Sequence, residues 1–183
     1  MNFRNTTRSW GAVSKALHWL IVLLILNQWV IAARAENLRL GEKLEVIKLH
    51  KSLGMTILAL AIIRLVWRWL NPVPSLEGLA KNWERRLAGL SHVLLYGLIF
   101  AIPLSGWLMS SARSFPVSWF GLFQFPDLVG NDKDFYNLMH GLHGQLNVAL
   151  AAVALLHIAG ALKHQFIDKN EVLRRMLPFG GVK

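Results

Sequence analysis

The chain has 183 residues, a formal net charge of +10 and no cysteine. Hydrophobic residues make up 54% of it and the mean hydropathy is +0.40, which is high for an ordinary soluble domain. The lack of cysteine excludes disulfides, iron–sulfur clusters, thiolate-bound metals and covalently attached c-type haem. Because the basic residues flank apolar segments, we interpret them as charges that orient a membrane protein, and we expect no nucleic-acid binding.

Four apolar segments have the length that a helix needs to cross a bilayer. We expect membrane spans at residues 14–34, 50–70, 87–110 and 141–163. No small-residue cleavage site follows the first span, so we expect no cleavable signal peptide. The prediction is an all-α fold, an integral membrane four-helix bundle that forms a single domain over residues 1–183.

The connections between these spans differ in character. Residues 35–49 are polar and of mixed charge, which predicts a loop. Pro72 and Pro74 end the second helix, and Pro103 is expected to kink the third span. The longest connection, residues 112–139, is rich in aromatic residues, and we expect a partly amphipathic element at the membrane interface there.

Basic side chains are unevenly distributed about the spans. In a four-span arrangement, 13 of the 20 Lys and Arg residues fall on the side of the two termini and seven fall on the other side. The positive-inside rule then predicts that both termini lie in the cytoplasm. We call this the inner side and the opposite side the outer side.

Four histidines lie in the apolar segments at matching depths, His18 and His157 towards the inner side and His50 and His143 towards the outer side. His143 and His157 are 14 residues apart, which in a helix means about 320° of rotation and roughly 21 Å of rise, so both point to nearly the same face. A histidine inside a membrane is costly and indicates a functional site. The topology therefore predicts an inner pair, His18 with His157, and an outer pair, His50 with His143.

Two histidines at one level on facing helices are the axial ligands that a low-spin haem b requires. A zinc or di-iron site needs three or more ligands at one level, usually with carboxylates, and no Asp or Glu lies within the interior of the four spans. We therefore expect two haems b. With both axial positions taken, each iron is expected to pass electrons and not to bind oxygen.

Three further histidines bear on this assignment. His140 lies about 100° away from the face of His157, so we prefer His143 as the outer ligand. His164 follows His157 by seven residues at the inner interface, where it contacts a quinone head group or a haem propionate, or is solvated. His92 opens the third span on the inner side, as a packing histidine or as a quinone ligand.

Several basic residues lie near the expected haem levels. Arg64 and Arg68, at the inner end of the second span, are interface anchors, or one of them contacts a propionate. Lys51 and Arg113 lie on the outer side, where they are candidates for the propionates of the outer haem.

Four sequence stretches carry a resemblance to a known family: SKALHWL, LHKSLGMTILALAIIRLVWR, LSHVLLYGLIFAIPLSGWLM and HGQLNVALAAVALLHIAGALKHQF. With them the chain resembles the bacterial cytochromes b561, the di-haem, four-helix family that includes the superoxide oxidases. The resemblance implies haem b between His18 and His157 and between His50 and His143, in the bacterial inner membrane. It also implies ubiquinone as the electron acceptor, with the quinone-contacting histidine at His164.

Three functions follow as hypotheses. The first is an enzyme that oxidises superoxide on the outer, periplasmic side and reduces ubiquinone, with Lys48, Lys51 and Arg113 attracting the anion. The second is a membrane anchor and electron carrier for a soluble dehydrogenase or hydrogenase, which acts as its redox-protein donor. The third, a small transporter, explains neither the paired histidines nor the lack of carboxylates within the spans.

Overall fold

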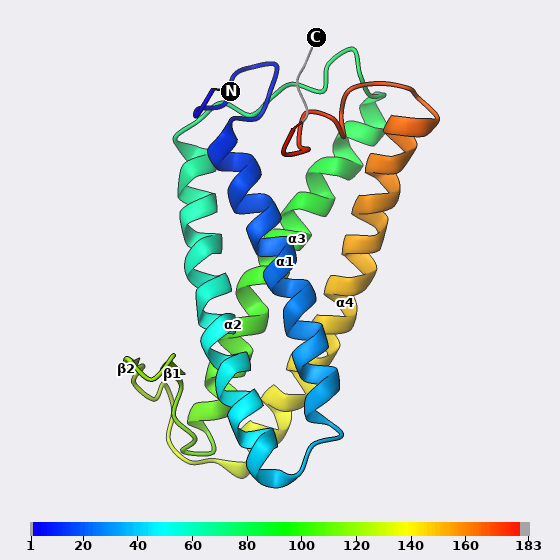
Figure 1. Ribbon diagram of the computed structural model, residues 1–183. Helices are drawn as coiled ribbons and strands as arrows, with labels where there is room; N and C mark the ends of the chain where they lie inside the picture. The colour runs from blue at the N-terminus through cyan, green and yellow to red at the C-terminus, as the bar shows by residue number, and fades with distance from the viewer. Residues whose placement is uncertain (1, 180–183) are drawn as a thin grey trace. The chain divides into compact units, whose positions relative to one another are not determined.

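Four long helices and one short hairpin make up the regular structure of the chain, which the computed structural model describes for residues 2–179 (Figure 1). The helices are α1 (Ala12–Ala35), α2 (Leu40–Trp69), α3 (Asn82–Ser111) and α4 (Lys133–Phe166). The antiparallel strands are β1 (Ser118–Trp119) and β2 (Phe123–Gln124). All four helices are long and apolar enough to cross a membrane, which confirms the prediction of four spanning helices.

The helices extend beyond the apolar segments. The prediction of a loop over the polar segment 35–49 is wrong for most of that segment, because α2 begins at Leu40. Its residues include Leu, Glu and Lys, which favour helix, and hydropathy alone does not report their preference. Helix α4 likewise begins at Lys133, where the Asp132 carboxylate accepts hydrogen bonds from the Asp134 and Phe135 N–H groups, both at 2.9 Å.

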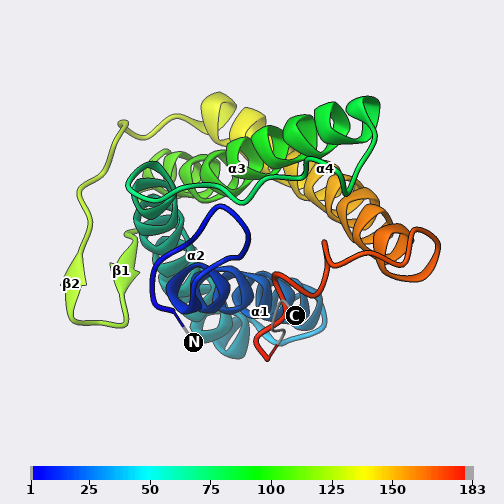
Figure 2. The same ribbon diagram turned by 90° about the horizontal axis from the view of Figure 1, so that it is seen from above.

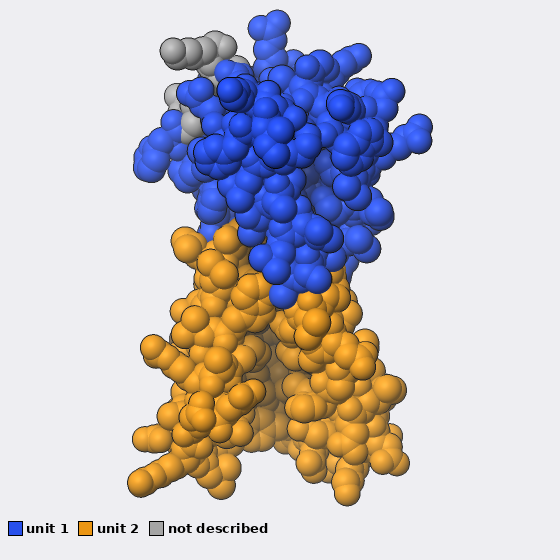
Figure 3. Space-filling view, turned by 90° about the vertical axis from the view of Figure 1, so that its right-hand side faces the viewer, with its two compact units in different colours: residues 1–20, 62–97, 150–183 blue, residues 21–61, 98–149 orange. Residues whose placement is uncertain are grey.

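Contacts divide the chain into two compact units (Figure 3). Unit 1 takes residues 1–20, 62–97 and 150–183, and unit 2 takes residues 21–61 and 98–149. Each of the four helices contributes one part to each unit. His18, His92, His157 and His164 therefore belong to unit 1, and His50, His140 and His143 belong to unit 2.

In unit 1, the segments before α1 and after α4 fold against the helix ends (Figure 2). The Asn5 side chain donates to the Pro72 carbonyl at 3.0 Å and accepts from the Ser14 hydroxyl at 2.7 Å. Trp19 of α1 donates its indole N–H to the Met176 carbonyl at 2.9 Å. These bonds tie both chain segments to the start of α1.

In unit 2, the hairpin packs on α2. Val117 forms a buried cluster with Met55 and Leu58 of α2. Phe120 (φ 50°) and Gly121 (φ 75°) both have positive φ at the tip, as a tight hairpin turn of this kind requires, although such a φ is strained for phenylalanine. The expected interfacial element of the long connection is thus a β-hairpin.

Many large apolar side chains point outward from the helices. Leu23 and Val148 in unit 2 and Leu155 in unit 1 are each more than 60% exposed. Exposed apolar surface on this scale is unusual for a protein in water and is the surface that lipid covers. Together with the four candidate spans, it indicates a membrane protein.

Candidate functional site

His50 of α2 and His143 of α4 face one another in unit 2. Their ring centroids are 6.3 Å apart and the rings are inclined at 69°. Two metal–nitrogen bonds of about 2 Å each, with about 1 Å from each nitrogen to its ring centre, add up to roughly 6 Å. The separation therefore fits one metal held between two imidazoles, and the donor set fits haem iron.

The orientation of His143 is determined by α3. Its Nδ1 lies 3.0 Å from the Ile102 carbonyl and 3.0 Å from the Ser105 hydroxyl. A carbonyl only accepts hydrogen bonds, so the bond to Ile102 requires a proton on Nδ1 and leaves the lone pair of a neutral ring on Nε2. Gly106 lies against the same ring, because a Cβ at this glycine would come within 3.3 Å of Cε1 of His143.

Polar side chains also hold the backbone at both histidines. Gln28 of α1 donates to the His50 carbonyl at 2.8 Å, and Asn147 donates to the His143 carbonyl at 2.8 Å. Nδ1 of His50 is buried and has no hydrogen-bond partner among the described residues. A buried imidazole nitrogen without a protein partner is what a site for an external group presents.

Three histidines gather in unit 1. The rings of His92 and His157 are 5.2 Å apart and inclined at 61°. His18 lies close enough to Arg64, His157 and His92 for their charges to act on it. Within the described chain it is thus His92 whose ring contacts His157, and the pairing of His18 with His157 stays a prediction.

The two arginines at the inner end of α2 have different surroundings. Arg64 donates to the Tyr96 hydroxyl at 3.1 Å and to the Ser14 carbonyl at 3.2 Å. Arg68 lies with its guanidinium 5.9 Å from the Trp10 ring. Arg64 therefore joins α2 to α3 and α1, and Arg68 lies against the segment before α1.

The outer basic residues are each engaged by a separate partner. Lys48 forms an exposed ion pair with Glu45 at 2.6 Å. Lys51 donates to the Phe115 carbonyl at 3.0 Å, with its ammonium 3.8 Å from that residue's ring. The contacts of the described residues do not join Lys48, Lys51 and Arg113 into one cluster.

Arg113 and His140 share one aromatic neighbour. The Arg113 guanidinium lies 4.5 Å from the Tyr136 ring, and His140 has its ring 5.8 Å from the same ring. The ring that His143 contacts is that of His50. His140 and His143 therefore contact different rings, and the choice of His143 as the outer ligand stays a prediction.

His164 lies in a charged network at the end of α4. Its Nδ1 is 2.9 Å from Oδ2 of Asp168 and 3.1 Å from Nδ2 of Asn170. Lys163 bridges Asp168 at 2.7 Å and Glu84 of α3 at 2.6 Å. The hydrogen bond from Lys163 is the main cause that holds the pKa of Asp168 below its ordinary value, so this carboxylate stays ionised at neutral pH.

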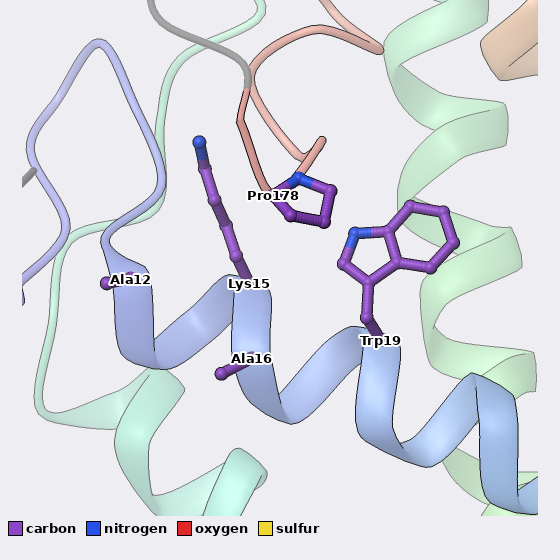
Figure 4. Close-up of a pocket in the computed structure, with 5 residues that line it drawn as sticks. All are labelled: Ala12, Lys15, Ala16, Trp19 and Pro178. Carbon is purple, nitrogen blue, oxygen red and sulfur yellow. The ribbon is translucent and has the colours of Figure 1, made fainter.

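A small cavity in unit 1 is lined by other residues than the histidines and charged side chains described above (Figure 4). Its volume is about 250 Å³, and its lining residues are Ala12, Lys15, Ala16, Trp19 and Pro178. Figure 4 shows Lys15 and Trp19 rising from α1, with Pro178 between them. None of the candidate haem ligands lines it.

The sequence analysis missed several residues that contact the histidines. Gln28 and Asn147 are polar residues inside apolar spans, a signal that by itself indicates a buried role. Ser105 and Gly106 lie within the stretch IPLSGWLM, where small residues allow close helix packing. Asp168 had no sequence signal, because it follows the last span among other charged residues.

The chain is similar to known proteins over nearly its whole length. Residues 9–179 match the family described as prokaryotic cytochrome b561. Cytochrome b561 homolog 2 of Escherichia coli (strain K12) is 33% identical over 182 residues, covering 97% of this chain and 95% of that protein. The probable superoxide oxidase CybB of Yersinia pestis is 25% identical over 171 residues, covering 93% of this chain and 97% of that protein. The chain therefore belongs to the prokaryotic cytochrome b561 family of membrane electron carriers, and this membership implies haem b.

Proposed function

We propose that the chain is a di-haem superoxide:ubiquinone oxidoreductase of the inner membrane, with both termini in the cytoplasm. His50 and His143 hold the outer haem b, and His18 and His157 hold the inner one. The observation that carries the proposal is the facing pair His50 and His143, 6.3 Å apart at their ring centroids. The haems supply one-electron transfer when they are bound.

The residues of the chain prepare the outer site in specific ways. The Ile102 carbonyl holds the proton of His143 on Nδ1, so Nε2 is the free ligand nitrogen. Gln28 and Asn147 fix the backbone of the two helices that carry the ligands. With these two imidazoles as its ligands, a haem held here would leave no open position for oxygen and would supply outer-sphere electron transfer.

The choice of substrates rests on charge and on one relative. Two superoxide anions lose one electron each and leave as O₂, and one quinone takes up two electrons and two protons. Basic residues near an entry site raise the encounter rate of an anion, and Arg113 and Lys51 supply such charge on the outer side. A relative named as a probable superoxide oxidase supports the same donor at 25% identity.

Purified protein with both haems tests this function directly. Superoxide added in the presence of a short-chain ubiquinone is expected to yield quinol, at a rate that falls with rising ionic strength because steering is screened. A neutral reductant serves as the control, since its rate is expected to vary little with salt. No quinol above the level of the protein-free reaction would refute the proposal.

A second function is favoured by the hairpin. Phe120, Leu122 and Phe123 are each about half exposed or more, and together they form an apolar tip on the outer side. Such a tip suits a membrane-bound carrier that receives electrons from a soluble dehydrogenase or hydrogenase. Haem reduction by a purified redox partner, together with inertness towards superoxide, would select this carrier function.

A further inference from the structure

Asn27 is a polar residue on the outward side of a spanning helix, α1. It is exposed, and Leu23, Leu26 and Val30 beside it are each about half exposed or more. Within the four expected spans, an exposed and uncharged polar side chain occurs in the described structure at two positions, Asn27 and Gln145 of α4. The outward side of α1 is therefore not uniformly apolar.

The amide of Asn27 has no hydrogen-bond partner among residues 2–179. Two other asparagines bond back to the carbonyl four residues earlier: Asn147 donates to His143 at 2.8 Å, and Asn71 donates to Trp67 at 2.9 Å. Asn27 makes no such bond with its own helix. It thus presents one acceptor oxygen and one donor –NH₂ group outward from α1.

Asn27 lies well inside the apolar part of α1. Arg34, the next charged residue on the outer side, follows it by seven residues, or about 10 Å of helix. Long Lys and Arg side chains cover such a distance to the headgroups, but asparagine is too short to do so. An amide that faces hydrocarbon without a partner is costly, so lipid alone does not satisfy this face.

Gln145 is in a different position relative to the bilayer. Trp29 of α1 donates to Asn147 of α4 at 3.4 Å, which brings these two residues to about the same depth. Because α1 runs outward and α4 runs inward, Gln145 lies roughly 6 Å further out than Asn27. Its side chain is also longer, so its amide reaches the headgroups.

We propose that two copies of the chain associate through the α1 face formed by Leu23, Asn27 and Val30, with the two Asn27 amides bonded to each other. The spacing of these residues, four and then three, is that of helices that pair along their length. Both copies cross the membrane in the same direction, so a twofold axis along the membrane normal pairs α1 with α1 in parallel and brings each residue opposite itself. A carboxamide is self-complementary, because its –NH₂ group donates to the oxygen of the other.

A second copy meets each requirement of this α1 face. It brings an amide at the depth of Asn27, and it brings Leu23 and Val30 to enclose the bond in apolar contacts. Arg34 stays at the outer end of the helix, where water reaches its charge. Lipid chains cover the apolar residues equally well, but they offer the amide neither a donor nor an acceptor.

Single introduced thiols test which faces meet, because the chain has no cysteine. Val30→Cys lies on the proposed face, and Val148→Cys on the exposed side of α4 is the matched control. The hydrogen bond between the adjacent Trp29 and Asn147 puts the two valines at similar depth. Each protein, purified with its haem, is reconstituted at a high lipid-to-protein ratio and oxidised with copper phenanthroline. Non-reducing gels follow the covalent dimer, and absorption spectra show that each variant is folded.

We expect Val30→Cys to form the covalent dimer at least tenfold faster than Val148→Cys. Adding Asn27→Leu to Val30→Cys is expected to slow the reaction about tenfold, because the bond between the helices is lost while a side chain of similar size remains. Adding Gln145→Leu to Val30→Cys instead is expected to leave the rate unchanged.

Equal rates for Val30→Cys and Val148→Cys are those of random collision and would overturn the proposal. A fast reaction of Val30→Cys that Asn27→Leu does not slow would overturn it as well, because the amide then does not hold the two copies together. Oxidation in native membranes gives a further check. An adduct with a mass other than twice that of the chain would assign the face to a different protein.

Discussion

His143 and His50 meet in one site but are held differently. His143 has a carbonyl and a hydroxyl at Nδ1, whereas Nδ1 of His50 has no partner among the described residues. A hydrogen bond at the second nitrogen of a ligand histidine fixes both its tautomer and its ring orientation. The position of His143 is thus determined by α3 before any haem binds, and that helix is where substitutions should disturb it.

Gly106→Ala tests the contact of this ring with α3. The added Cβ lies 3.3 Å from Cε1 of His143, so the ring has to shift by a few tenths of an ångström. We expect the outer haem to be retained roughly tenfold more weakly, measured by haem titration and absorbance. Gly97→Ala is the control in the same helix, because its Cβ meets open space. Equal haem affinity in the two variants would show that Gly106 does not position His143.

The three histidines of unit 1 require a direct test of the ligand set. We expect His18→Ala and His157→Ala to lose the inner haem and His92→Ala to keep it. We expect this because His18 and His157 are the pair that matching depth in opposing apolar segments predicts, whereas His92, the eleventh residue of α3, has its ring against that of His157. The measurement is the reduced-minus-oxidised spectrum of each variant. Loss of haem in His92→Ala but not in His18→Ala would make His92 the partner of His157.

At the scale of elements, hydrogen bonds from side chains of α2 hold the hairpin against that helix. Ser52 is almost fully buried, and its hydroxyl lies 2.9 Å from the Ser118 carbonyl and accepts from the Phe120 N–H at 3.1 Å. Trp119 donates its indole N–H to Thr56 at 3.1 Å. Two side chains of α2 therefore hold the backbone and the aromatic ring of a segment more than 60 residues away.

Ser52→Ala is expected to loosen the hairpin. It leaves the Phe120 N–H without its acceptor, which costs about 1 kcal/mol because this donor is only partly buried. We expect a lower unfolding temperature and faster proteolysis within the hairpin. Ser91→Ala is the matched control, since among residues 2–179 that hydroxyl donates to the Ala88 carbonyl of its own helix turn. If both variants have the stability of the unmodified chain, Ser52 does not anchor the hairpin.

At the scale of the whole molecule, each unit contains one of the two expected ligand pairs. We expect two non-covalent haems b per chain, because the pairs are separate and no cysteine is present to attach haem covalently. Acid-acetone extraction should remove all haem, and the pyridine haemochrome assay should give a ratio of two. A ratio of one, or haem that stays on the protein, would contradict this arrangement.

The charge distribution predicts the orientation of the molecule. Because the chain has no cysteine, Thr7→Cys and Asn131→Cys each introduce a single exposed thiol at opposite ends of the spans. An impermeant thiol reagent is expected to label Asn131→Cys in intact spheroplasts and Thr7→Cys only after lysis. The reverse pattern would place the His50–His143 pair on the cytoplasmic side and exclude it as the entry site for periplasmic superoxide.

The sequence by itself determined the features that follow from hydropathy and from helical spacing. Apolar length determined the number of candidate spans. The helical angle predicts His143, and not His140, as the outer ligand. The sequence did not predict the helical start of α2 before His50, because hydropathy does not record the helix preference of polar residues. It also did not predict the hairpin, whose strands are only two residues each and whose contacts are with distant α2.

The tertiary structure alone decided which side chains meet. Ile102 and Ser105 contact His143 across about 40 residues, and His92 contacts His157 across the same pair of helices, α3 and α4. Such contacts depend on the rotation of each helix about its axis. In a membrane span the lipid-facing side is as apolar as the packed side, so the hydrophobic pattern does not encode that rotation. Close packing and hydrogen bonds between helices set it instead, and these appear only in the folded molecule.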